Sequence, residues 1–152
     1  MTTDVRTADI RTALEPYHVR YEVRPYFVVL DQRPEGAPPV EEKIQAGFEV
    51  DLSAALEKCE FPVFHTEKAR MVVSYFESLA REIEAAAGQH CTVDVIPDES
   101  LVLDVQKHFQ PEAMLQIRIS HERGLDQPAG PPEEQALKAI RSALHELEIR
   151  ES

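Results

Sequence analysis

One segment of the chain alternates apolar and polar positions without a break. Its apolar positions are Ile44, Ala46, Phe48, Val50 and Leu52, and a polar residue or a glycine stands between each pair. Successive side chains of a strand point to opposite faces of a sheet, so this pattern predicts a strand with one buried and one wet face. Such a strand needs a cover on its dry face only. We therefore expect an α+β fold in which helices cover one face of a sheet.

Other stretches alternate in the same way, which predicts a five-stranded, mostly antiparallel sheet. The strands are expected at residues 19–30, 44–52, 91–96, 101–109 and 115–120. The first two would form a hairpin around a mobile, proline-rich loop at residues 31–42, and the last three would form a meander. Pro25 interrupts the first strand and therefore indicates a sheet edge or a bulge. For residues 101–109, a helix is the competing interpretation.

The order of apolar and polar residues in the last two strands of the meander predicts how these strands pair. If Val105 faces Ile117 on the dry side, then Asp104 faces Arg118 on the wet side. A shift by one residue would place apolar against polar side chains throughout, which the burial of one face forbids. We therefore expect a cross-strand ion pair between Asp104 and Arg118.

Three segments have helical spacing, and residues 1–152 are expected to form one α+β domain. A short N-terminal helix is predicted at residues 5–15. The central helix begins at Thr66, a favourable N-cap, and ends before Gly88. The last helix begins at Pro131, with proline and acids in its first turn. Two or three of these helices would pack on the dry face and leave the other face polar.

The chain is acidic, with a net charge of −12 at pH 7 and no basic run. This charge repels phosphate, so we expect neither nucleic acid nor an anionic membrane as a partner. No apolar stretch is long enough to span a bilayer, and the N-terminal residues lack the apolar core of a signal peptide. The two cysteines, Cys59 and Cys91, indicate reduced thiols and hence a soluble, cytoplasmic protein.

Polar side chains on the wet face form the first candidate site. Those of the meander are Asp94, Asp104, His108, Gln116, Arg118 and Ser120, which would adjoin Glu49 and Asp51 if the second strand is a neighbour. Carboxylates and an arginine in such proximity could perform acid–base chemistry or hold a cation. The simpler interpretation, which we favour, is a solvated sheet face whose charges give solubility and register.

The second candidate is the loop at residues 121–130, which leads to the start of the last helix. Helix N-termini bind anions through their free N–H groups, and His121 and Arg123 would suit a carboxylate or phosphate ligand. Together with Asp104 and Arg118 from the sheet, they form the predicted ligand-binding set. Ordinary turn chemistry is again the simpler interpretation, because two glutamates already occupy the first helical turn.

No metal site or cofactor is expected. The sequence lacks glycine-rich phosphate loops, the nucleophile elbow G-x-S-x-G, and the motifs H-E-x-x-H and C-x-x-C. Its six histidines are never spaced three or four residues apart, and His90 and Cys91 would point to opposite faces of a strand.

These features favour a protein-interaction or ligand-binding module, while enzyme activity is left open. We expect a homodimer, or a complex with another protein, that forms through the open sheet face or an exposed strand edge. The alternative is a small enzyme or a binder of small anions, with a pocket between the sheet and loop 121–130. A pocket lined by His121 and Arg123 beside an unpaired carboxylate would favour that alternative.

Overall fold

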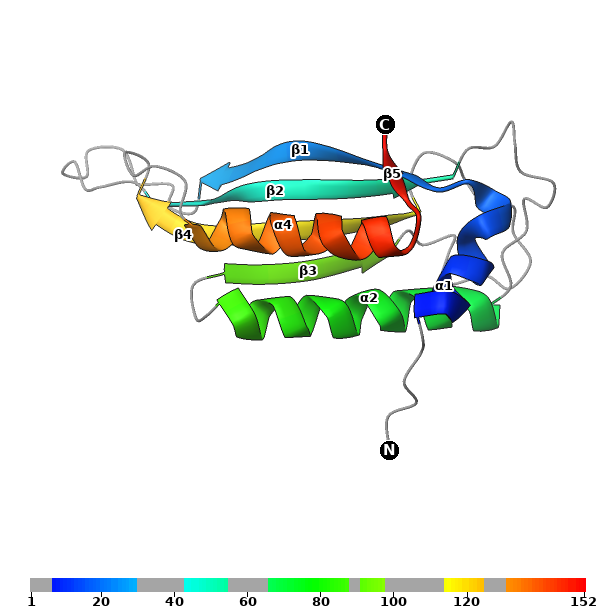
Figure 1. Cartoon of the computed structure of the whole chain (residues 1–152). Coiled ribbons are helices and arrows are strands. Elements are labelled where there is room, and N and C mark those ends of the chain that lie inside the picture. Colours follow the sequence, from blue (N-terminus) through cyan, green and yellow to red (C-terminus); the bar gives the residue numbers. More distant parts are fainter. Residues whose placement is uncertain (1–6, 30–42, 55–65, 88–90, 98–113, 125–130) are drawn as a thin grey trace.

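The computed structural model describes residues 7–29, 43–54, 66–87, 91–97, 114–124 and 131–152, which form three α-helices and a five-stranded sheet (Figure 1). The helices are α1 (Thr7–Leu14), α2 (Thr66–Ala87) and α4 (Pro131–Glu146), and a short 3-10 helix, η1 (Glu15–Tyr17), continues α1. The strands are β1 (Arg20–Val29), β2 (Lys43–Ser53), β3 (Cys91–Pro97), β4 (Leu115–Gly124) and β5 (Arg150–Glu151). The predicted α+β class is confirmed.

The strands follow the order β3-β4-β2-β1-β5 in the sheet. The predicted hairpin of β1 and β2 is confirmed, with Tyr21 opposite Leu52. The pairs β2–β4 and β3–β4 are also antiparallel, but β5 lies parallel to β1. The sheet is therefore mixed. The predicted loop at residues 31–42 lies outside the described residues.

The position of β4 corrects the predicted meander. This strand lies between β2 and β3, so that Arg118 pairs with Glu49 on one side and with Asp94 on the other. Both edges of β4 are thus occupied. The predicted ladder along this strand, with Asp104 opposite Arg118, is therefore wrong, and residues 101–109 themselves lie outside the described residues. The alternation of β4 fits any strand of the same period, so it did not identify the neighbour.

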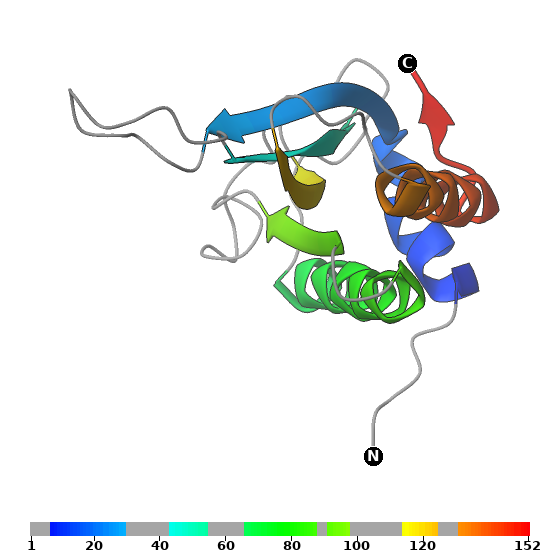
Figure 2. The same cartoon turned by 90° about the vertical axis from the view of Figure 1, so that its left-hand side faces the viewer.

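The dry face of the sheet packs against the helices. The buried apolar residues of β2 and β4 are Ile44, Ala46, Val50, Leu52, Leu115, Ile117 and Ile119. α2 packs against β3, and α4 packs against β4, β3 and β2; Figure 2 shows both helices on the same side of the sheet. Phe76 of α2 and Ile140 and Leu144 of α4 are fully buried there. Each such side chain stabilises the fold by about 1.5–3 kcal/mol.

The two helix-to-strand junctions, at residues 10–20 and 140–150, have the same construction. Both stretches have the same order of buried and exposed positions. Each contains one residue with a positive φ, His18 at 47° and Glu148 at 61°. The N–H of that residue donates to the carbonyl three positions earlier, at 3.3 Å and 3.0 Å respectively. A residue in the left-handed backbone conformation commonly ends a helix. Beyond these turns, β1 and β5 run side by side and parallel.

Gly47 permits the close approach of β2 and β4. It lies opposite Ser120, and a Cβ atom placed on it would overlap the carbonyl oxygen of Ile119. The obstacle is backbone rather than a flexible side chain. Any side chain at this position would therefore force the two strands apart locally.

We expect Gly47→Ala to lower the free energy of unfolding by about 2–3 kcal/mol, because only movement of a strand can relieve the overlap. Chemical denaturation followed by circular dichroism measures this change. Thr92→Ala is a matched control, since Thr92 is exposed in the same cross-strand row as Gly47, and it should change stability by less than about 0.5 kcal/mol. Equal losses in the two variants would contradict the steric explanation.

Candidate functional site

The predicted ligand-binding residues do not share one face of the sheet. Arg118 lies on the polar face, whereas His121, three residues further along β4, points to the face that the helices cover. The cross-strand neighbour of His121 on β3 is Cys91. Only the backbone of Arg123 is described, and Asp104 and residues 125–130 lie outside the described residues. Arg118 and His121 therefore have different surroundings.

The polar face carries a network of ion pairs and hydrogen bonds across three strands. Because β2 is the neighbour of β4, Glu49 and Asp51 adjoin Gln116 and Arg118, as expected for that arrangement. Nη2 of Arg118 lies 3.0 Å from Oε1 of Glu49. Nε2 of Gln116 donates to Oδ1 of Asp51 at 2.7 Å. Nε of Arg24 on β1 lies 3.5 Å from Oδ2 of the same aspartate. The charges thus neutralise one another within the face.

Arg118 also stacks on Tyr26 of β1. Its Cζ atom is 4.4 Å from the centroid of the ring. The β2 residue directly opposite Tyr26 is Gly47, so the ring lies beside a position that carries no side chain. A cation–π contact of this kind contributes about 0.5–1 kcal/mol at a partly exposed site. The network therefore joins β1, β2 and β4 on the solvent side of the sheet.

We expect a double-mutant cycle of Arg118→Ala and Glu49→Ala to give a coupling energy of about 0.5–1.5 kcal/mol. The two side chains are only 29% and 20% exposed, so water screens their ion pair weakly. Arg141 and Glu151 provide the control, because they also pair, at 3.3 Å, but are 46% and 44% exposed. Their coupling should stay below about 0.5 kcal/mol. Equal coupling in both cycles would contradict a role for burial.

A buried carboxylate contacts His121 on the other face. Glu133 lies in the first turn of α4 and is 1% exposed, and its Oε1 is 3.2 Å from Nδ1 of His121. A negative charge at this place interacts with the helix dipole itself and repels a second anion. Glu133 stands four residues before Leu137, the first position of the apolar stripe. That spacing is the sequence signal from which its inward direction could have been predicted.

Cys91 is buried beside this pair. Burial, followed by the negative charges of Glu133 and Glu84, raises the pKa of the Cys91 thiol to about 11. The thiol is therefore protonated at neutral pH. Although Cys91 is the cross-strand neighbour of a histidine that contacts a carboxylate, the thiolate that a cysteine nucleophile requires is disfavoured.

The raised pKa predicts a stability change at high pH. Folding favours the protonated thiol, so its contribution is fully present below the ordinary pKa of 9.0 and is lost as the pH rises to about 11. We compare the variant Cys59→Ser with the double variant Cys59→Ser/Cys91→Ala, which lacks the thiol. Over this pH interval the free energy of unfolding of the single variant should fall by about 2–3 kcal/mol more than that of the double variant. Denaturant titrations of both variants at several pH values measure it. A constant difference between them would contradict the raised pKa.

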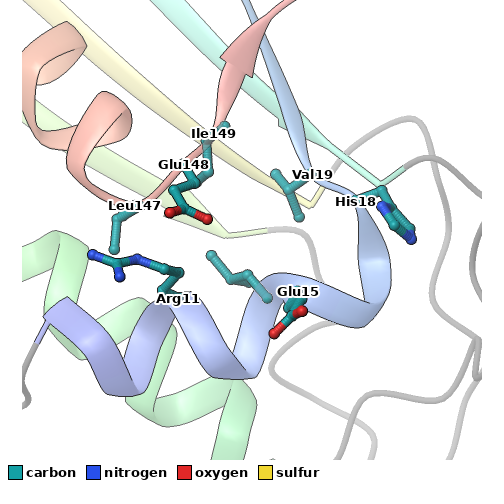
Figure 3. Close-up of a pocket in the computed structure, with 8 residues that line it drawn as sticks. Arg11, Glu15, His18, Val19, Leu147, Glu148 and Ile149 are labelled. Atoms are coloured by element: carbon teal, nitrogen blue, oxygen red, sulfur yellow. The ribbon is translucent and has the colours of Figure 1, made fainter.

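A cavity of about 250 Å³ lies between the two helix-to-strand junctions (Figure 3). Its lining consists of Arg11, Leu14, Glu15, His18, Val19, Leu147, Glu148 and Ile149. The side chains of Glu15 and His18 point away from it in Figure 3. Arg11 donates from Nη2 to the carbonyl of Glu146 at 2.9 Å, at the C-terminal end of α4, where a positive charge is favoured. The charged residues thus do not converge on a ligand position, and the volume is below that of usual ligand pockets.

Within the described ranges, no three His, Cys, Asp or Glu side chains are grouped so that they could hold a metal ion. No described helix is both long and apolar enough to cross a membrane. No protein-family model, curated protein or solved structure matches the chain. What the protein does is therefore inferred from its own surfaces.

The two outer edges of the sheet differ in how they are covered. At β3, Oε1 of Glu84 on α2 accepts a hydrogen bond from the Val93 N–H at 2.8 Å. At the opposite side, β5 pairs with β1 only at Arg20 and Tyr21. In the part of the chain that the structure describes, residues 22–29 of β1 have no strand on this side. The edge of β3 is thus covered at Val93, whereas most of the edge of β1 has no strand partner within the described residues.

The direction of the free backbone groups follows from one hydrogen bond. The Ser152 N–H donates to the Tyr21 carbonyl at 2.8 Å, so Tyr21 faces away from β2. By the alternation of an antiparallel strand, the residues that also face outward are Val23, Pro25, Phe27 and Val29. Proline has no backbone N–H. Because the backbone of Pro25 faces away from β2, this missing donor costs no hydrogen bond between β1 and β2. Of the two predicted explanations of this proline, the bulge is wrong, because the register with β2 runs on without one; Pro25 instead lies where β1 has no outer strand partner within the described residues.

The open edge also exposes large apolar side chains. Phe27 is 54% exposed, Val28 41% and Val29 42%. They are consecutive residues at the end of β1, beside the free backbone groups. An uncovered strand edge with exposed apolar side chains is the usual form of a surface that pairs with another chain.

Proposed function

We propose that this protein is an interaction module that takes up an additional β-strand along the open edge of β1. The observation that carries this proposal is the coincidence of two features at residues 23–29. Their outward N–H and C=O groups lack a strand partner within the described chain, and three consecutive apolar side chains are exposed at the same place. Backbone hydrogen bonds would supply affinity, and the side chains would supply selectivity.

The other edge of the sheet supports this choice. Glu84 accepts the Val93 N–H and α2 packs along β3, so that edge is protected from pairing. The polar face supports an interaction less well, because Arg24 and Arg118 are already engaged by carboxylates of the same face. The edge of β1 is thus the surface that is best suited to bind.

The alternative of a small enzyme or an anion binder near loop 121–130 has no comparable support. Glu133 places a negative charge beside His121, and the thiol of Cys91 is protonated at neutral pH. We also propose a cytoplasmic location, with which the free thiol of Cys91 agrees.

We expect a synthetic peptide with the sequence of residues 20–29 to bind the protein as an extra strand. With the peptide in large excess, the outward amides of Val23, Phe27 and Val29 should exchange slowly, as followed by NMR. Phe27→Lys should weaken the peptide at least about tenfold, because it removes an apolar contact and adds a charge that must be desolvated. Because Phe27 is exposed, the variant should still fold, and the weaker binding would not result from unfolding.

Ile96→Lys is the matched control, because Ile96 is an apolar residue of the covered strand β3 and is 39% exposed. It should bind the peptide like the unmodified protein. Amides of β1 that exchange rapidly both with and without the peptide, or an equal effect of both lysine variants, would contradict the proposed function.

A further inference from the structure

We infer that the strand taken up by this edge is β1 of a second copy of the chain, paired antiparallel about a twofold axis at Tyr26. The inference rests on the proposed use of the β1 edge and specifies its partner. It follows from the pattern of residues on the edge, from the hydrogen-bond donors that the edge offers, and from the position of the exposed apolar side chains.

The outward row of β1 is apolar and nearly symmetric about Tyr26. With the axis at this residue, Val23 faces Val29 of the second copy, and Pro25 faces its Phe27. The row contains no charge, although the chain as a whole carries a net charge of −12. A surface that complements itself in this way suits a closed, two-fold dimer.

The hydrogen-bond donors of the edge are all used in this register. Each copy offers the outward N–H groups of Val23, Phe27 and Val29. They would donate to the carbonyls of Val29, Pro25 and Val23 of the second copy, which gives three bonds from each copy. The one carbonyl left over, on Phe27, is the group that faces the proline nitrogen. Pro25 therefore selects the register instead of preventing the pairing.

Neighbouring registers use the edge less well. An axis at Arg24 would place Phe27 opposite Tyr21, whose carbonyl already accepts the Ser152 N–H. An axis at Phe27 would leave the N–H of Val23 without a partner among residues 20–29. The register at Tyr26 thus forms more hydrogen bonds inside the open stretch than its neighbours do.

The same pairing covers the exposed apolar residues. Phe27 and Val29 of both copies would form a continuous strip with Val23, beside the existing core. Val28 lies on the polar face, where it would face Arg24 of the second copy and cover the aliphatic part of that side chain. Three of the four large apolar residues exposed in the described structure would thus be covered.

Charge distinguishes a second copy from a basic partner protein. Two copies with a charge of −12 repel each other, while the paired edge is apolar. Salt screens this repulsion, so moderate salt should strengthen dimer formation relative to low salt. A complex with a basic protein would respond in the opposite direction.

Size-exclusion chromatography with light scattering on the full chain, at low and moderate salt, tests the partner. The unmodified protein and Ile96→Lys should be dimers whose dissociation constants fall as salt is raised. Phe27→Lys should raise the dissociation constant at least about tenfold.

Disulfide cross-linking tests the register in a Cys59→Ser background. Tyr26 would form a non-hydrogen-bonded pair with its own copy, with Cα atoms about 4.5 Å apart, which is within the range that a disulfide spans. Tyr26→Cys should therefore form a disulfide-linked dimer under mild oxidation. Arg24→Cys is the control on the same face, because the two copies of that residue would be displaced by about 13 Å along the strands, and it should not cross-link.

A monomer at both salt concentrations would overturn the inference, and so would cross-linking of Arg24→Cys in place of Tyr26→Cys. A monomer that still binds the peptide of residues 20–29 would overturn the second copy as partner and leave the proposed function intact. A dimer that Phe27→Lys does not weaken would overturn the pairing of two copies through β1, and absence of peptide binding as well would overturn both.

Discussion

The pairing of β2 with β4 is the constraint on which the rest of the structure depends. These strands are far apart in the sequence, and their ladder sets Val50 against Ile117 on one face and Glu49 against Arg118 on the other. One set of backbone hydrogen bonds thus builds the core and the polar network together. It also requires Gly47, since a side chain there would meet the backbone of β4. With β4 held in the interior of the sheet, β3 becomes one outer strand and β1 borders the other side.

Several carboxylates serve as internal partners in this acidic protein. Glu49 engages an arginine, Glu133 engages a histidine beneath the sheet, and Glu84 accepts a backbone N–H. In each case a negative charge is set against a donor of the protein itself, which offsets the cost of burying it. An excess of acidic residues therefore did not indicate a cation site. It supplied partners for polar groups that would otherwise lie unpaired at the borders of the core.

The ends of the long helices could be predicted because local chemistry defines them. The helix before Gly88 and the helix that begins at Pro131 have the predicted limits. Strand pairing could not be predicted in the same way, because alternation fixes the face of a side chain and not the neighbouring strand. Arg118 was expected to pair with Asp104, but its ion-pair partner is Glu49 on β2. β5 has two residues, too few to show any period, so no sequence pattern indicated it.

The covered edge of β3 has a consequence for the size of any assembly. A sheet with two open edges can add chains at both ends without limit, as in fibrils. In the part of this protein that the structure describes, α2 packs along β3 and the carboxylate of Glu84 accepts the Val93 N–H, so the β3 side is less open to a further strand than the β1 side. Addition at β1 by another copy would consume the open edge of both. Growth by strand addition would then stop after a single step, because α2 lies along the far side of the sheet in each copy.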